Sequence, residues 1–322
     1  MFRPVISTTL ALVLLAAPPV VTAGAQGVPP IVIRDQKMAQ GALREVDQQL
    51  SAAVKRRSRD ALLQAITHFQ QTIDALATLE YQGLQDEVKK SRALYQQALG
   101  TLLEVMTVSC EHGSIADGLA AGDLLRALDV QAQQALGSRT VDALRVRVPA
   151  CLKLELKIDS KITQSELKYV VHVDVRVPLT YNLNTGDYSG RGTVSNVEQA
   201  LAPDGGCDHD LPFTPTSFTV QHLALQRSGD FVLSDVLLDR YDPAGGTELM
   251  KVTCPDSPQL TVPMMNWGLA FSTVRHLTGG LVVSGWRMGQ PAGLVASKVI
   301  EQPVSQTFVE ATDMVLVRAA AR

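Results

Sequence analysis

The spacing of apolar residues changes near residue 145, and this change limits the folds that the chain can adopt. From Met38 to Val54, apolar residues recur every three or four positions, which is the period of an amphipathic helix. From Leu152 to Asp159, apolar and charged residues alternate one by one, which is typical of a strand with one buried face. The sequence therefore predicts an α+β protein whose helices precede its strands.

The first part of the chain has several apolar runs of helical period. They lie at residues 38–54, 62–79, 84–105 and 125–136. Ser58 is a suitable N-cap for the second run, and Gly137 is a suitable C-terminal residue for the last one. Helices with short connections pack as antiparallel hairpins. We therefore expect an antiparallel helical bundle over residues 26–144.

The second part has short β-branched runs separated by turn residues. Asn184-Thr185-Gly186-Asp187 and Arg227-Ser228-Gly229-Asp230 are examples of such turns, and the second is expected to close a hairpin. Regular short strands without helical patterns between them favour an antiparallel β-sandwich or β-barrel. The period does not distinguish these two folds. We assign residues 145–322 to this all-β domain.

The amino terminus has the pattern of a cleavable signal peptide over residues 1–25. Arg3 is followed by an uncharged apolar stretch from Val5 to Ala17 and by the small residues Ala23-Gly24-Ala25. The stretch is shorter than the roughly 20 residues that span a bilayer. An uncleaved anchor is the alternative reading. We expect a secreted or periplasmic protein without a transmembrane span after cleavage, which implies an oxidising compartment.

The charge balance argues against some partners. The chain has 29 basic and 32 acidic residues, and nucleic-acid binding needs an excess of basic side chains. The basic run Lys55-Arg56-Arg57 lies at a helix junction, where we expect a solvated turn, with contact to an anionic surface as the alternative. We therefore expect an unknown protein or envelope component as partner, and no nucleic acid.

The cysteines are expected to form disulfides because their number is even in an exported chain. They are Cys110, Cys151, Cys207 and Cys254. The preferred pairing joins Cys110 to Cys151 and Cys207 to Cys254. A zinc site is the alternative, because Cys110 and Cys207 each begin a C-x-H sequence, with His112 and His209.

One polar cluster and no catalytic motif are found. Asp208, His209 and Asp210 are adjacent and are expected to form a solvated loop. A general base or a cation site is the alternative. The sequence has no G-x-S-x-G, H-E-x-x-H, Walker or G-x-G-x-x-G motif, so no catalytic residue, metal ligand or cofactor is assigned.

The sequence favours a non-enzymatic binding or scaffolding role in the cell envelope. Two alternatives stay open. One is a secreted hydrolase of an envelope ester or glycan, for which Asp208, His209, Asp210 and Asp242 would be tested first. The other is a carrier of an apolar ligand, which would need an apolar cavity inside a closed barrel.

Overall fold

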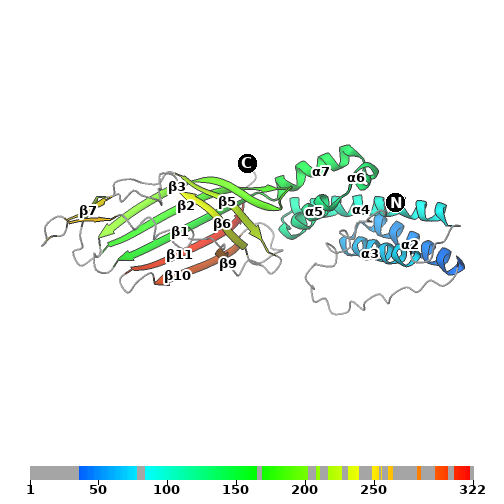
Figure 1. The fold of residues 1–322 in the computed structure, drawn as a ribbon, viewed down its shortest axis with the longest axis horizontal. Helices are drawn as coiled ribbons and strands as arrows, with labels where there is room; N and C mark the ends of the chain where they lie inside the picture. The colour runs from blue at the N-terminus through cyan, green and yellow to red at the C-terminus, as the bar shows by residue number, and fades with distance from the viewer. Residues whose placement is uncertain are drawn as a thin grey trace, which may run out of the picture. The chain divides into compact units, whose positions relative to one another are not determined.

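The computed structural model divides the chain into two compact units, Met1–Cys151 and Leu152–Arg322. It describes residues 36–77, 84–164, 169–201, 208–210, 217–226, 231–238, 249–253, 255, 260–263, 281–283, 294–303 and 308–319. The first unit is helical in its described part and the second consists of antiparallel strands (Figure 1). The predicted order of helices before strands is therefore confirmed.

Six helices form the described part of the first unit. They are α2 (Gln36–Arg56), α3 (Arg59–Ala77), α4 (Gln85–Glu111), α5 (Ile115–Ala127), α6 (Val130–Leu136) and α7 (Ser138–Cys151). Helix α2 contacts α3 and α4, and α4 also contacts α5, α6 and α7. Helix α4 is therefore the element around which the other helices of this unit pack.

The helices bury the apolar stripes that the sequence shows. In α2, the fully or nearly fully buried residues are Ala39, Leu43, Val46, Leu50 and Ala53. Helix α2 ends at Arg56. The next residue, Arg57, has a positive φ of 50°, and Ser58 directly precedes α3. The Ser58 carbonyl accepts a hydrogen bond from the Leu62 amide. Burial of these stripes removes apolar area from water, and this is the main stabilising contribution in such a unit.

The last predicted helical run consists of two helices instead of one. The Leu128 backbone is extended between α5 and α6, and the Asp129 carboxylate accepts a hydrogen bond from the Ala132 amide at 2.7 Å. An aspartate in this position satisfies a free N–H group of a new first turn. Helix α6 ends at Gly137, as predicted, with a φ of 84°.

Residues 145–151 belong to the helical unit, which corrects the predicted boundary at residue 144. Arg145-Val146-Arg147-Val148 alternates like a strand in the sequence. In the structure, Val141, Leu144, Val148 and Cys151 are buried at helical spacing in α7, while Val146 is 72% exposed. Packing of this stripe against α4 and α5 outweighs the local alternation, because propensity is weak compared with tertiary burial.

The second unit contains eleven described strands. They are β1 (Leu154–Gln164), β2 (Tyr169–Asn182), β3 (Asp187–Leu201), β4 (Asp208–Asp210), β5 (Ser217–Leu225), β6 (Phe231–Leu238), β7 (Leu249–Thr253), β8 (Leu260–Pro263), β9 (Leu281–Val283), β10 (Leu294–Pro303) and β11 (Phe308–Arg318). Eight of them form one sheet in the order β10-β11-β1-β2-β3-β5-β6-β9, and β4-β7-β8 form a second sheet. All of the described pairs are antiparallel.

The predicted alternation in the strands is confirmed where burial is described. Leu154, Leu156 and Ile158 of β1 are buried and lie opposite the buried Leu179, Val177 and Val175 of β2. Opposed residues of neighbouring strands share a face. The sheet therefore has one apolar buried face over its central strands.

The predicted turn at residues 184–187 joins β2 to β3. Gly186 has a φ of 80°, and its amide donates to the Asn182 carbonyl at 2.8 Å. Strands β5 and β6 pair from Leu225 opposite Phe231, so they form the antiparallel pair expected there. Residues 227–230 of that predicted turn lie outside the described residues.

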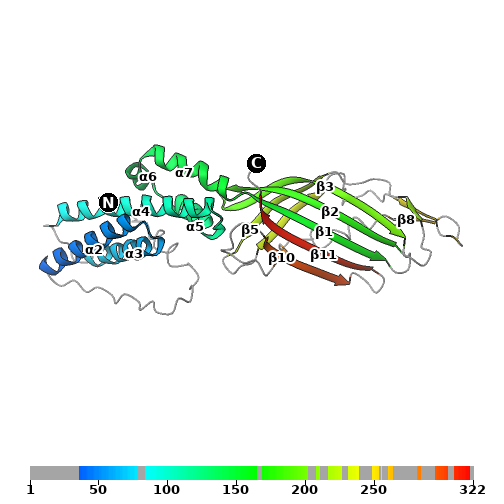
Figure 2. The ribbon, with the colours of Figure 1, turned by 180° about the vertical axis from the view of Figure 1, so that it is seen from behind.

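The large sheet is curled (Figure 2), and two glycines of β3 allow an unusually close approach to β2. A Cβ atom on Gly192 would lie 1.8 Å from the Arg176 carbonyl oxygen, and one on Gly190 would lie 2.1 Å from that of Pro178. The described strands thus form a curled sheet, and the choice between a sandwich and a closed barrel stays a prediction.

Candidate functional site

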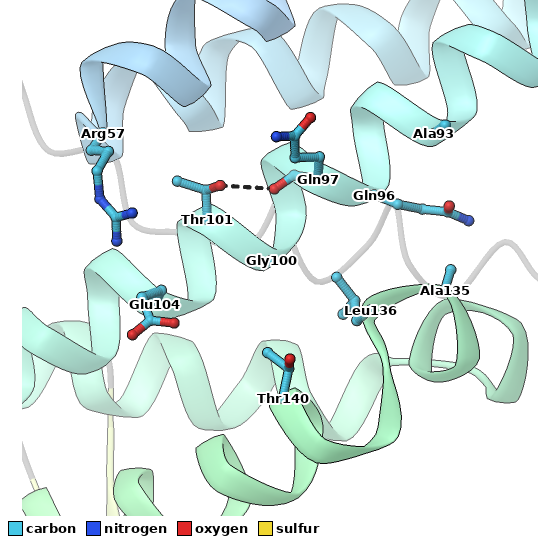
Figure 3. A pocket seen from close by; sticks show the side chains of 10 residues that line it. All are labelled: Arg57, Ala93, Gln96, Gln97, Gly100, Thr101, Glu104, Ala135, Leu136 and Thr140. Carbon is cyan, nitrogen blue, oxygen red and sulfur yellow. Dashed lines mark hydrogen bonds between the residues drawn. The ribbon is translucent and has the colours of Figure 1, made fainter.

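An open hollow of about 470 Å³ lies in the helical unit, beside the middle of α4 (Figure 3). Its lining comes from α4, from α6 and the start of α7, and from the turn between α2 and α3. The lining residues are Arg57, Ala93, Gln96, Gln97, Gly100, Thr101, Glu104, Ala135, Leu136 and Thr140. The volume is within the range of about 300–1,000 Å³ found for ligand sites.

Two glycines place the walls of this hollow. A Cβ atom on Gly100 would lie 2.9 Å from Cδ2 of Leu136, so glycine allows α6 to approach α4 closely. Gly137, with its φ of 84°, then turns the chain from α6 into α7, and Thr140 reaches the same hollow. Figure 3 shows Leu136 and Thr140 on the side of the hollow opposite Arg57.

The lining carries groups that form hydrogen bonds. Gln96 and Gln97 bring two side-chain amides from α4, and each amide can both donate and accept. The Thr101 hydroxyl already donates to the Gln97 carbonyl at 2.9 Å. Arg57 forms no ion pair with another residue of the described ranges. The hollow therefore offers amides and a guanidinium to a ligand.

Glu104, at one end of the hollow, is held by an ion-pair network. Arg147 of α7 donates to Glu104 at 3.0 Å and to both carboxylate oxygens of Glu111 at 2.8 and 2.9 Å. These bonds from Arg147 lower the pKa of Glu111, and the two glutamates raise the pKa of Arg147. The network therefore ties α7 to two positions of α4, one of which, Glu104, lines the hollow.

The predicted disulfide between Cys110 and Cys151 is present next to this network. Its S–S distance is 2.01 Å and its Cα atoms are 5.8 Å apart. Both cysteines are buried. The bond joins the last turns of α4 and α7. A zinc site that uses the Cys110 thiolate is therefore wrong, because this sulfur is already covalently bonded.

The Asp117 carboxylate connects three helices of this unit. Asp117 of α5 accepts hydrogen bonds from Ser109 of α4 and, at 2.9 Å, from Nε of Arg59 of α3. Its side chain is 14% exposed, so these bonds compensate much of its lost hydration. The described partners of Asp117 are Ser109 and Arg59. We therefore assign this carboxylate a structural role, which is to hold α3, α4 and α5 together.

Comparison with known proteins identified no similar protein. The chain matches no protein-family model, no curated protein and no solved structure. Among the helices of the described ranges, none is long and apolar enough to cross a membrane. The function is therefore argued from the chain's own residues.

The polar cluster predicted as a loop forms strand β4, so that prediction is wrong. Asp208, His209 and Asp210 pair with residues 251–253 of β7. In the described part of the chain, no group of three or more His, Cys, Asp or Glu side chains is arranged to hold a metal ion. Asp242, Cys207 and Cys254 lie outside the described residues, so their roles stay predictions. Asp208 and Thr253, the chain neighbours of the two cysteines, are cross-strand partners.

The sequence analysis missed an Asp–His pair in the strand unit. Asp187, at the start of β3, accepts hydrogen bonds from Nδ1 of His222 in β5 and from the Thr185 hydroxyl. Asp187 is 13% exposed and His222 is 52% exposed. No described serine, threonine or cysteine bonds to His222, so the pair lacks the nucleophile of a catalytic triad. Its partners are 35 positions apart, and no local motif could have indicated them.

Proposed function

We propose that this chain is an exported cell-envelope protein with a non-enzymatic binding role, and that the hollow beside α4 binds an extended peptide segment of a partner protein. The observation that supports it is the hollow itself, whose wall carries the Gln96 and Gln97 amides and Arg57, which has no ion-pair partner among the described residues. Side-chain amides match the donors and acceptors of a peptide backbone.

The charge of the lining indicates the composition of the segment. Glu104 shares the Arg147 guanidinium with Glu111, whereas Arg57 has no ion-pair partner in the described ranges. A guanidinium binds carboxylates in a two-pronged geometry. The partner segment is therefore expected to carry an aspartate, a glutamate or a free carboxyl terminus opposite Arg57.

Site-specific photo-crosslinking in producing cells tests this proposal. A photoreactive residue at Gln97, which is exposed on α4, should give a discrete adduct with one partner, while the same residue at the exposed Gln48 of α2 should not. Thr140→Trp, which fills the hollow, should remove the adduct. Arg139→Trp is the matched control, because Arg139 is exposed beside it but does not line the hollow.

The role of Arg57 is tested in the same experiment. Arg57→Gln should reduce the adduct at least severalfold, because it removes the charge and keeps a side chain of similar length. Arg56→Gln, at an exposed neighbour outside the lining, should leave it unchanged. Equal adducts at Gln48 and Gln97, or an adduct that survives Thr140→Trp, would contradict binding in the hollow.

A further inference from the structure

The hollow beside α4 has two chemically different ends. Arg57 and the Glu104 carboxylate lie at one end, and Ala93 and Ala135 lie at the other (Figure 3). Both alanines are exposed, and their small side chains leave space for a larger group beside them. Two glutamine amides of α4 lie between the ends. An elongated ligand therefore meets charged groups at one end of the hollow and apolar groups at the other.

The length of the hollow follows from the face of α4 that lines it. The lining residues of this helix recur every three or four positions from Ala93 to Glu104. Arg57 lies toward the Thr101 end of this row (Figure 3). Because an α-helix rises 1.5 Å per residue, Ala93 and Thr101 are about 12 Å apart along its axis. An extended chain covers about 13 Å in four residues, and side chains four positions apart point to the same face.

The apolar end fits one large apolar side chain. Ala93 and Ala135 form it together with Leu136, whose side chain is partly exposed and lies above Gly100. None of these side chains has a polar group that would lose its hydration when covered. Each Å² of apolar surface that a ligand buries there contributes about 25 cal/mol. A leucine or a phenylalanine of the ligand therefore gains more at this end than a polar residue would.

The charged end fits a single carboxylate. Arg57 is exposed and has no ion-pair partner in the described ranges. Glu104 is 38% exposed and shares the Arg147 guanidinium with Glu111. A first carboxylate of the ligand can pair with Arg57, whereas a second one beside it would be repelled by Glu104. This end therefore disfavours a run of acidic residues.

We infer that the partner segment carries one large apolar side chain and one carboxylate four positions apart, the first at Ala93 and Ala135 and the second at Arg57. This register rests on the proposed function, because it assumes that an extended peptide occupies the hollow, and it adds the sequence pattern by which the segment is recognised. A helical segment would need about eight positions to cover the same 12 Å. The spacing therefore also reports the conformation of the bound segment.

Selection from a random peptide library displayed on phage tests the register with the purified mature protein. The same selection on Thr140→Trp, in which the hollow is filled, gives the background. Peptides enriched on the wild type over this background should contain an apolar residue and an aspartate or glutamate four positions apart. The two should occur in one consistent order along the peptide, and acidic runs should not be enriched.

Calorimetric titration with the most enriched peptide assigns its two ends. Replacing the acid of the peptide by the matching amide should weaken binding to the wild type about three- to tenfold. The same replacement should change binding to Arg57→Gln less than twofold, because the partner of the acid is already absent. Ala93→Leu fills the apolar end and should also weaken binding. Ala52→Leu is its matched control, since Ala52 is exposed on α2 and does not line the hollow.

Three results would overturn the register. One is enrichment of a different spacing, such as the seven or eight positions of a helical segment. Another is an equal effect of the acid-to-amide replacement on the wild type and on Arg57→Gln. The third is the absence of any peptide enriched over the Thr140→Trp background. A crosslinked adduct at Gln97 that Thr140→Trp removes would still support binding in the hollow in each case, so the register and the proposed function fail separately.

Discussion

Arg147 of α7 contacts two glutamates of α4. It bridges Glu104, which lines the hollow, and Glu111, which is adjacent to the disulfide residue Cys110. The geometry with Glu111 is two-pronged, and such pairs combine strength with orientation. Its side chain is 33% exposed, so solvent screening limits its contribution to stability.

Arg147→Ala should lower the free energy of unfolding at pH 7 by about 1 kcal/mol. It should also change the pH dependence. Arg147 lowers the folded-state pKa of Glu111 below its ordinary value of 4.5, so this stabilisation is complete above that value and is lost as the pH falls through the folded pKa. Urea denaturation between pH 7 and pH 3 should show a smaller decrease for the variant than for the wild type.

Arg145→Ala is the control for this measurement. Arg145 lies on the same helix and bonds only to the neutral amide oxygen of Gln133 at 3.2 Å among the described contacts. Its removal should leave the pH dependence unchanged. A decrease of the same size in wild type and Arg147→Ala would show that Arg147 does not stabilise the ionised Glu111.

Local sequence predicted some single residues well and others not at all. Gly137 and Gly186 were expected at a helix end and a turn, because glycine adopts positive φ without a steric penalty. Arg57 also adopts a positive φ, which no side-chain preference indicates. Asp187 and His222 meet only because β3 and β5 are neighbours in the sheet, although they are 35 positions apart in the sequence.

At the scale of elements, the close approach of β2 and β3 depends on the two glycines of β3. Gly192→Ala should destabilise the strand unit by about 2–3 kcal/mol, since the Cβ atom would meet a backbone carbonyl, which cannot move like the end of a side chain. Thermal denaturation followed by circular dichroism measures the effect.

Gly41→Ala is the matched substitution in the other unit. Gly41 is exposed within α2, and a Cβ atom there would meet nothing within 4 Å. Alanine should stabilise that helix by about 1 kcal/mol, because it has the higher helix propensity. If Gly192→Ala kept or raised the stability of the strand unit, the expected steric contact with the Arg176 carbonyl would be contradicted.

The spacing of apolar residues did not predict every boundary of the helices. Residues 145–148 alternate and were included in the predicted all-β domain, but they are helical because Val148 and Cys151 complete a buried stripe. The break at Leu128 was missed because the apolar spacing continues across it. The Asp129 cap is recognisable in retrospect, since aspartate is a favoured N-cap residue.

At the scale of the whole molecule, we predict that the protein is exported, that its signal peptide is removed and that its cysteines form disulfides. The mature protein should begin at Gln26, or at Gly24 if cleavage follows Ala23, and should contain a bond between Cys110 and Cys151. Non-reducing peptide mass spectrometry of the exported protein measures both, and it also tests the predicted bond between Cys207 and Cys254. An intact residue 1–25 segment would contradict cleavage of the signal.

The disulfide should stabilise mainly the helical unit, because both of its cysteines belong to that unit. The double variant Cys110→Ala/Cys151→Ala should lose about 3–4 kcal/mol for a loop with a sequence separation of 41. Gly192→Ala affects the other unit, so in a thermal scan each change should lower the melting temperature of its own unit only. Loss of stability in the strand unit from the cysteine variant would contradict this assignment.

The sequence by itself determined the order of helices before strands, the buried stripes and several chain turns. These features depend on the spacing of apolar residues and on the backbone freedom of glycine, which are local properties. The tertiary structure decided the extent of α7, the hollow beside α4 and the Asp187–His222 pair. Each of these depends on side chains that are distant in the chain and meet only after the elements have packed.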